Sequence, residues 1–124
     1  MVEIKKCLDT YSLVEVAKGN SKFADYLNSD FVIADITLAE FYAIILREYD
    51  ENTADYWYKK LESNSCSADL SILIEGVKFR YKNRKSNVSF FDAVGYIFSL
   101  KNGCLFVTGD KEFESFKGVE FSKK

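Results

Sequence analysis

The sequence predicts an α/β protein built on a parallel sheet with helices on both faces. Short apolar runs, rich in β-branched and aromatic residues, alternate along the chain with longer segments that have helical spacing. No repeat, linker or low-complexity tract interrupts the 124 residues. A chain of this length fits one domain of ordinary size, so a single domain spanning residues 1–124 is expected.

The first elements alternate between strand and helix. An apolar run at residues 2–8 predicts a strand, and residues 12–18 predict a helix that ends at Gly19, a residue typical of helix C-termini. A short helix at residues 21–27 is followed by a β-branched and aromatic strand at residues 31–36.

The middle of the chain is predicted to be mainly helical. Thr37 is expected to cap a long helix, in which the apolar positions with helical spacing are Leu38, Phe41, Tyr42, Ile45 and Tyr49. Residues 53–62 predict another helix, and residues 64–67 break the pattern where a short strand could lie. A helix at residues 68–83 follows, with one apolar side formed by Leu70, Leu73, Ile74, Val77 and Tyr81.

The last elements return to the strand–helix alternation. Ser89 is expected to cap a helix that runs to Leu100 and ends at residues 102–103. A strand at residues 104–107, a short helix at residues 111–116 and an edge strand at residues 119–121 follow.

The composition excludes several kinds of chemistry. Histidine is absent, which removes an imidazole base, a Ser–His or Cys–His pair and a histidine zinc site. The six glycines are scattered and form no phosphate-loop or dinucleotide motif. An enzyme here must use carboxylates, hydroxyls, Lys and Arg, a set that favours Mg²⁺ or Mn²⁺. The net charge of −2 gives no global basic field, so a nucleic acid would need a local basic patch.

The cysteines and the hydropathy predict a cytoplasmic protein. Cys7, Cys66 and Cys104 are odd in number, show no CxxC spacing and lie in or beside apolar stretches, so buried, reduced thiols are expected. No apolar run approaches the roughly 18 residues of a membrane span. Residues 1–5 show no signal-peptide core.

Four acidic residues stand where strands or helices are predicted to begin or end. Asp9 and Asp110 close apolar strands, and Glu40 and Asp92 lie in the first turns of two helices. In a parallel sheet, the carboxyl ends of the strands and the adjoining helix turns share one crevice. Four carboxylates there repel one another unless a hard divalent cation sits among them. The set therefore predicts a Mg²⁺ or Mn²⁺ site.

Each of the four acids also has a purely structural interpretation. Residues 37–40 match a capping box, in which Glu40 would reach back to the Thr37 backbone N–H. Asp92 occupies the equivalent position after Ser89, where a carboxylate also suits the helix dipole. Asp9 and Asp110 could cap the helices that follow them. Caps need no convergence on one edge of the sheet, however, and this convergence favours the metal site.

The segments around these acids resemble those of PIN-domain nucleases. The matching stretches are Cys-Leu-Asp-Thr at 7–10, Thr-Leu-Ala-Glu-Phe at 37–41, Ser-Phe-Phe-Asp-Ala-Val at 89–94 and Leu-Phe-Val-Thr-Gly-Asp-Lys-Glu-Phe at 105–113. The order and spacing of the acids match over essentially the whole chain. The resemblance implies a three-layer α/β/α sandwich around a central parallel sheet, and metal-dependent cleavage of RNA. Chains this short are most similar to the toxins of virulence-associated (protein C type) toxin–antitoxin pairs, which implies an antitoxin partner.

The resemblance also implies roles for single residues. Asp9, Glu40, Asp92 and Asp110 match the catalytic, metal-binding acids, and Thr108 matches a nearby hydroxyl. Glu112 stands where the family often has a further acid, usually Asp, and is a candidate extra ligand. Asp35 precedes Thr37 and is interpreted as a loop cap, with a place among the metal ligands as the open alternative. Carboxylates leave coordination positions to water and substrate phosphate, so metal-activated water would attack phosphorus and leave 5′-phosphate and 3′-hydroxyl ends.

Two further features suggest partners. Residues 77–85 contain five basic residues and two aromatic ones, and Lys78, Lys82 and Arg84 are candidate RNA contacts. The alternative is a helix C-terminus with cations that suit its dipole. A second feature is aromatic: Tyr42, Tyr49, Tyr56 and Trp57 predict either core packing or a surface for a homodimer or a partner helix.

The sequence thus predicts a metal-dependent endoribonuclease of the toxin type. Three alternatives stay open: an RNA-processing PIN nuclease outside toxin–antitoxin pairs, a non-catalytic PIN-fold module that binds RNA or protein, and a phosphoryl-transfer receiver or phosphatase. Against the last, Thr10 and Tyr11 follow Asp9, so the Asp-x-Asp pattern of many such phosphatases is absent.

Overall fold

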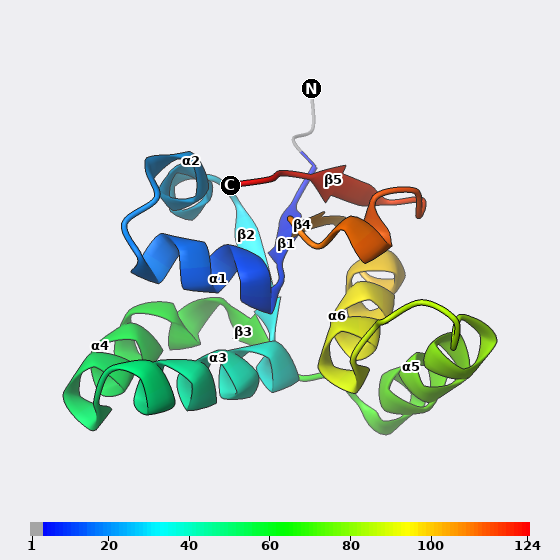
Figure 1. Cartoon of the computed structure of the whole chain (residues 1–124), viewed down its shortest axis with the longest axis horizontal. Helices are drawn as coiled ribbons and strands as arrows, with labels where there is room; N and C mark the ends of the chain where they lie inside the picture. The colour runs from blue at the N-terminus through cyan, green and yellow to red at the C-terminus, as the bar shows by residue number, and fades with distance from the viewer. Residues whose placement is uncertain (1–3) are drawn as a thin grey trace.

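A five-stranded parallel sheet forms the centre of the computed structural model, which describes residues 4–124 (Figure 1). The strands are β1 (Lys6–Leu8), β2 (Phe31–Ala34), β3 (Ser65–Cys66), β4 (Leu105–Thr108) and β5 (Val119–Phe121). Their order is β3-β2-β1-β4-β5, and every neighbouring pair is parallel. Residues 2 and 3 of the first expected strand lie outside the described residues.

Helices cover both faces of this sheet (Figure 1). On one face lie α1 (Thr10–Ala17), α2 (Ser21–Ala24), α3 (Asp35–Glu48) and α4 (Glu51–Leu61). On the other lie α5 (Leu70–Lys82) and α6 (Phe90–Lys101). Single 3-10 turns occupy Asp25–Asn28, Glu62–Asn64 and Lys111–Phe113. The expected three-layer α/β/α sandwich with a central parallel sheet is confirmed.

Two hydrophobic cores lie on the two faces of the sheet. Successive strand residues point to opposite faces, so Cys7 and Phe106 pack under α6 while Leu8 and Val107 pack under α1 and α3. These four side chains are at most 1% exposed. Burial on both faces explains why the central strands read as continuous apolar runs rather than alternating ones.

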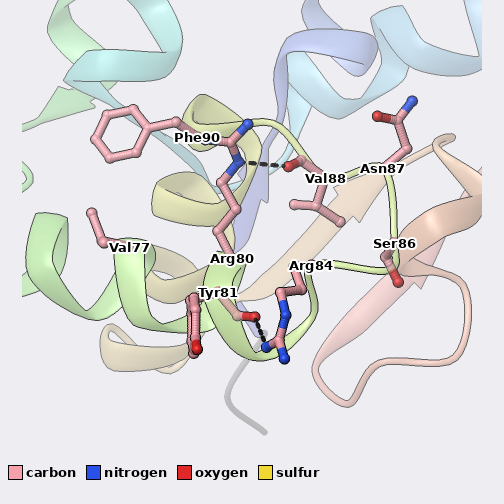
Figure 2. Close-up of a pocket in the computed structure, with 8 residues that line it drawn as sticks. All are labelled: Val77, Arg80, Tyr81, Arg84, Ser86, Asn87, Val88 and Phe90. Carbon is pink, nitrogen blue, oxygen red and sulfur yellow. Dashed lines mark hydrogen bonds between the residues drawn. The ribbon is translucent and has the colours of Figure 1, made fainter.

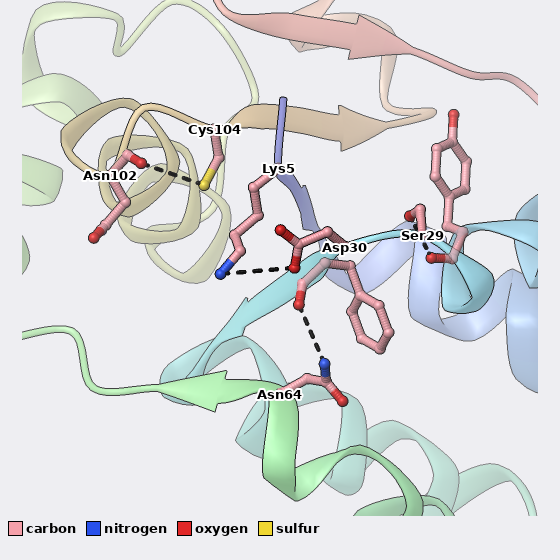
Figure 3. Close-up of polar contacts among 8 residues, drawn as sticks. Lys5, Ser29, Asp30, Asn64, Asn102 and Cys104 are labelled. Carbon is pink, nitrogen blue, oxygen red and sulfur yellow. Dashed lines mark hydrogen bonds and ion pairs between the residues drawn. The ribbon is translucent and has the colours of Figure 1, made fainter. Parts of the chain in front are cut away.

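Polar contacts secure the amino ends of the strands (Figure 3). The Asn64 side chain donates a hydrogen bond of 3.2 Å to the Phe31 carbonyl, which ties the segment before β3 to the start of β2. Lys5 forms an ion pair of 3.8 Å with Asp30, next to the β1–β2 pairing. The edge strand β3 has only two residues, so such side-chain contacts help to hold it in place.

Helix α3 begins earlier than the sequence pattern predicts. The chain passes from β2 directly into the helix at Asp35, and no side chain caps the first turn. Thr37 lies inside the helix and is 3% exposed. The predicted capping box from Thr37 to Glu40 is therefore wrong. The reason is tertiary packing: the Thr37 side chain lies against Gly95 of α6, where an added Cβ would be 3.1 Å from its hydroxyl oxygen.

Helix α5 turns a different face inward from the one that its spacing predicts. Most of the residues expected on the buried side are exposed: Leu70, Ile74, Val77 and Tyr81. Leu73 packs on the core as expected, but its companions there are Ile72 and Phe79, which the predicted apolar side did not include. Gly76 sets this orientation, because it is buried against α6 and a Cβ there would lie 2.7 Å from Val94.

The aromatic residues of α3 and α4 divide into two groups. Tyr42 and Trp57 pack against the core, and the Tyr42 hydroxyl donates a hydrogen bond of 2.7 Å to Asp55. Tyr49 and Tyr56 are 53% and 58% exposed. Core packing therefore explains two of the four residues that the sequence singled out, and two remain on the surface.

Two further expectations concerned the burial of the cysteines and the absence of a membrane-spanning segment. Cys7 and Cys104 are buried as expected, but Cys66 is exposed, because it ends the short edge strand β3. Burial raises the pKa of the Cys7 thiol far above its usual range, so it stays protonated. Within residues 4–124, no helix is long and apolar enough to cross a bilayer.

Candidate active site

Asp9 links the central strand to the first helix. It follows β1, is 2% exposed, and its Oδ1 accepts a hydrogen bond of 2.8 Å from the Ser12 backbone N–H, which caps α1. The Ser12 hydroxyl donates in turn to the Val107 carbonyl at 3.0 Å. The end of β1 is thus fastened to the end of β4, and Asp9 is held at the carboxyl edge of the sheet.

The turn after β4 places Asp110 beside Asp9's strand. The Thr108 Oγ1 accepts a hydrogen bond of 3.0 Å from the Asp110 N–H, and the Asp110 Oδ1 accepts one of 3.0 Å from the Glu112 N–H. Gly109 lies between them without room for a side chain: a Cβ would be 2.1 Å from the Tyr11 ring and 2.7 Å from the Ser122 carbonyl. The Thr-Gly-Asp turn therefore requires glycine for space.

Glu40 and Asp92 approach from two helices. Glu40 lies in the second turn of α3 and accepts a hydrogen bond from the Thr10 hydroxyl of α1. Asp92 lies in the first turn of α6, whose cap is Ser89, as expected: the Ser89 Oγ accepts a hydrogen bond of 3.1 Å from the Asp92 N–H.

One cavity of about 440 Å³ brings these four carboxylates together. Its lining consists of Asp9, Thr10, Tyr11, Glu40, Asp92, Gly109, Asp110 and Lys111. The ends of two strands and the N-terminal turns of two helices, which lie far apart in the sequence, therefore meet at one edge of the sheet. This edge is where ligands bind in open parallel sheets.

The carboxylates disturb one another electrostatically. Burial raises the pKa of Asp9 to about 7, opposed by the Thr108 and Ser12 hydrogen bonds and reinforced by the charge of Asp92. Burial likewise raises the pKa of Asp92 to about 6, and the charges of Glu40 and Asp110 add to the shift. Proximity of like charges in a poorly solvated cavity is a recurrent property of functional sites.

The donor set fits a hard divalent cation in kind. It consists of carboxylate oxygens, with hydroxyls nearby and no imidazole or thiol. As the side chains stand, no three acidic or thiol groups among residues 4–124 converge closely enough to form a ready-made ion site. A cation would therefore draw the carboxylates together from their positions around the cavity.

Two other acids considered from the sequence do not line this cavity. Glu112 follows the Asp110 turn and contributes its backbone N–H to it. Asp35 starts α3, and its Oδ1 accepts hydrogen bonds from the Ile36 N–H at 2.7 Å and the Ala68 N–H at 3.1 Å. Asp35 thus ties the segment before α5 to the start of α3.

The basic run of α5 faces a separate cavity (Figure 2). Of the three candidate RNA contacts, only Arg84 lines this cavity. Lys78 projects elsewhere and forms an exposed ion pair of 3.9 Å with Glu75. Arg80, a basic residue of the same run that was not among the three candidates, lines the same cavity as Arg84.

A comparison of the sequence with protein-family models finds the PIN domain over residues 6–119. The chain belongs to the PIN domain family. The match runs from β1 to β5, and so it contains all four carboxylates of the cavity. No curated protein matches the sequence significantly.

Solved structures share the fold of this PIN domain at low sequence identity. A toxin–antitoxin complex from Klebsiella pneumoniae has a TM-score of 0.75 and 17% identity, covering 96% of this chain and 99% of that one. The Mycobacterium tuberculosis toxin VapC20, described as cleaving the sarcin-ricin loop, has a TM-score of 0.75 and 13% identity, with coverages of 92% and 98%. DNA-bound VapBC from Salmonella typhimurium has a TM-score of 0.75 and 20% identity, with 98% of each chain covered.

Several lining residues of the PIN domain's cavity escaped the sequence reading. Thr10 and Tyr11 follow Asp9 in the first turn of α1, and Lys111 follows Asp110. Their adjacency to two candidate acids is a usable signal, because residues next to a strand-end carboxylate share its edge of the sheet. The hydrogen bond from Thr10 to Glu40 joins positions 30 residues apart and has no such signal.

Proposed function

We propose that this PIN domain is a Mg²⁺- or Mn²⁺-dependent endoribonuclease that hydrolyses RNA phosphodiester bonds. The observation that carries the proposal is the convergence of Asp9, Glu40, Asp92 and Asp110 on one cavity at the carboxyl edge of the sheet. Structural caps account for Asp9 and Asp110 singly. They give no reason for Glu40, which caps nothing, to line the same cavity.

Asp9, Glu40, Asp92 and Asp110 would hold the cation. In the two capping carboxylates, Oδ1 accepts the backbone hydrogen bond, and a carboxylate has a second oxygen with which to bind. A divalent cation here would lower the pKa of bound water and offset charge developing on the phosphodiester. Its charge would also offset the burial, and the lesser repulsion, that raise the pKa of Asp9 and Asp92.

Other residues of the cavity would position these groups. The Thr10 hydroxyl holds the Glu40 carboxylate in a fixed orientation. Thr108, which is fully buried, accepts a hydrogen bond from the Asp110 N–H, and its side chain lowers the pKa of Asp9, so it acts on the acids at both strand ends. Lys111 is the one cationic side chain among the lining residues described, and its ammonium would attract a substrate phosphate.

We further propose that the enzyme is the toxin of a toxin–antitoxin pair and acts in the cytoplasm. Several structures with the same fold are described as toxin–antitoxin or VapBC assemblies, and they match nearly the full length of this chain. A short gene next to this one that encodes a DNA-binding antitoxin would support the pairing. An isolated gene would favour an RNA-processing nuclease.

The test is a nuclease assay on total RNA with metal titration. Wild-type protein should cleave with Mg²⁺ or Mn²⁺ and lose activity in EDTA, and Mn²⁺ should raise its melting temperature because it binds only the folded state. Asp9→Asn and Asp110→Asn should each abolish cleavage while the fold persists.

Asp69→Asn is the matched control. Asp69 caps α5 through the same kind of hydrogen bond, 3.0 Å from the Ile72 N–H, but it does not line the acidic cavity. Normal cleavage by this variant and none by the other two would separate catalysis from capping. Normal turnover in Asp9→Asn or Asp110→Asn would refute the proposal, and an inactive wild-type protein that still binds RNA would favour a binding module.

A further inference from the structure

A second cavity, of about 410 Å³, opens between α5 and the loop that leads to α6 (Figure 2). Its lining combines two guanidinium groups, two small polar side chains and an apolar wall. The residues are Val77, Arg80, Tyr81, Arg84, Ser86, Asn87, Val88 and Phe90. A nucleotide offers groups that complement this lining: a negative phosphate, polar atoms and the flat apolar face of a base.

Both arginines of this cavity are held in place by the chain around them. The Arg80 Nε donates a hydrogen bond of 3.1 Å to the carbonyl of Val88, a buried residue of the loop. The Arg84 Nη1 donates one of 3.0 Å to the Tyr81 carbonyl, and its guanidinium lies 4.5 Å from the centroid of the Tyr81 ring. Each guanidinium keeps further N–H donors for a ligand, because it has five.

The positive charge of the cavity is not compensated. No carboxylate belongs to its lining, and within the described residues 4–124 neither Arg80 nor Arg84 has an acidic oxygen within ion-pair distance. Two orientated guanidinium groups without counter-charges attract an anion, and their planar donor forks suit phosphate oxygens better than an ammonium does.

The arrangement of the two groups indicates a chain of phosphates rather than a single ion. In Figure 2 the Arg80 side chain extends towards the Val88 carbonyl, whereas Arg84 turns back towards Tyr81. The two guanidinium groups therefore do not converge on one point. Separated cations along an apolar wall match the repeated charge and the exposed bases of a single-stranded nucleic acid.

The first turn of α6 connects this cavity with the acidic one. Phe90 lines the arginine cavity and Asp92 lines the acidic cavity. Two residues on one helical turn lie on opposite sides of a cylinder about 10 Å across. A strand that crosses this turn can therefore reach both cavities.

We propose that the cavity of Arg80 and Arg84 binds the backbone of single-stranded RNA beside the scissile bond. The assignment rests on the proposed ribonuclease function. It differs from a general basic field, because Lys78 and Lys82 are on the same helix but do not line the cavity. RNA contact is thus assigned to the two orientated arginines, with the lysines adding only long-range attraction.

The test measures binding of a short, fluorescently labelled single-stranded RNA in EDTA, by anisotropy over a range of salt concentrations. Arg80→Ala with Arg84→Ala should weaken binding by about tenfold or more and lower the slope of log K against log salt by about 1.4, since each phosphate contact on a single strand contributes about 0.7. Lys78→Ala with Lys82→Ala removes the same charge from α5, which also carries Arg80, and should change the slope by less than half as much.

Conservative variants guard against a folding effect. Arg80→Lys with Arg84→Lys should restore the salt slope but not the full affinity, because lysine supplies charge without the fork. Millimolar inorganic phosphate should compete weakly with the RNA, whereas strong competition would mean a single-anion site and overturn the assignment to a strand.

The outcomes separate this inference from the proposed function. Equal losses in the arginine and lysine pairs would refute the pocket, even if the wild-type protein cleaves RNA. Selective loss in the arginine pair, in a protein that binds RNA but never cleaves it, would refute the ribonuclease and leave the pocket standing. Wild-type protein that binds no RNA in EDTA would refute the pocket, and the cleavage assay with metal would then decide the ribonuclease separately.

Discussion

At the scale of single residues, Asp9 combines two tasks in one carboxylate. It caps α1 and it lines the acidic cavity, and it does so while almost completely buried. A buried carboxylate is costly to ionise, and this one also faces the charge of Asp92. Stability and activity therefore make opposite demands on the same group.

This conflict predicts how stability depends on pH in the metal-free protein. The folded-state pKa values of about 7 for Asp9 and about 6 for Asp92 exceed the ordinary value of 3.8. At a pH between 3.8 and its folded-state pKa, each carboxyl group is largely protonated in the folded state and largely ionised in the unfolded state. The free energy of unfolding should therefore fall as pH rises, by up to about 1.4 kcal/mol per unit for each group. The stabilisation is complete below pH 3.8 and lost above about pH 7.

Denaturant titrations in EDTA from pH 5 to 8 test this dependence, because this range includes the folded-state pKa values of both groups. Asp9→Asn keeps the shape of the side chain and removes its titration, so its slope should be flatter and its stability at pH 8 higher than in wild type. Stability that rises from pH 5 to 8 in wild type would contradict the assignment of both shifts.

Thr10 offers a second test at this scale. Thr10→Val keeps the volume but removes the hydroxyl that orients Glu40. Partners of this kind typically contribute 10–100-fold to metal affinity, and we expect a loss of about that size. Mn²⁺ titration measures it directly, and Thr10→Ser should restore most of the affinity. A Thr10→Val protein with wild-type affinity would show that Glu40 needs no such support.

At the scale of elements, α6 is the helix on which the site most depends. Its residues from 93 to 99 are all buried, it carries Asp92, and it packs against α5 through Gly76. A side chain at position 76 would collide with the backbone and side chain of Val94. The absence of a Cβ at that one position therefore fixes how closely α5 approaches the helix that bears Asp92.

Gly76→Ala should accordingly destabilise the protein, although alanine is the better helix former. Overpacking of this kind costs about 1–3 kcal/mol, which exceeds the roughly 1 kcal/mol gained from helix propensity. Thermal melts measure the effect. The control is Lys82→Ala, which changes an exposed side chain on the same helix. A melting temperature equal to or above that of wild type would mean that α5 and α6 move apart enough to accept the methyl group without loss of stability.

The elements also show what the sequence could and could not reveal. Strands β1, β2 and β4 were predictable because burial on both faces makes them continuous apolar runs. The start of α3 was not, because the threonine that resembles a cap is buried against another helix. The inward face of α5 was predicted only at Leu73, since a glycine contact, and not the apolar spacing, decides its orientation.

The same limits apply to the candidate site. Strand ends and helix starts were sufficient to predict that the four acids share one edge of the sheet. The hydrogen bond from Thr10 to Glu40 was beyond reach, because it depends on how α1 and α3 lie across the sheet. Arg80 was missed because the loop before α6 brings the Val88 carbonyl to it.

At the scale of the whole molecule, exposed aromatic and aliphatic side chains favour self-association. Tyr49 and Tyr56 are more than half exposed, and so is Leu70 on the opposite side of the sheet. Apolar groups that gather on a surface commonly mark an interface. We therefore retain the prediction of a two-fold homodimer and place it first at α3 and α4.

Light scattering at micromolar concentrations tests this prediction. Tyr49→Glu with Tyr56→Glu should halve the measured mass, because buried, unpaired charges disfavour the interface. Leu70→Glu with Ile74→Glu on α5 is the matched comparison, and a loss of dimer in that pair alone would move the interface there. A wild-type protein that remains monomeric at all concentrations measured would contradict the prediction of a homodimer.

The order of the strands has a consequence for biosynthesis. β1 lies at the middle of the sheet, yet its partner β4 comes 100 positions later along the chain, counted from Leu8 to Thr108. At translation rates of 5–20 residues per second, roughly 5–20 s separate the emergence of the two strands. Until then the central strand has one unpaired side and Asp110 is missing from the cavity. A nascent chain that has not reached Asp110 therefore lacks the assembled carboxylates, so the proposed activity can arise only after β4 and the turn that follows it have been synthesised.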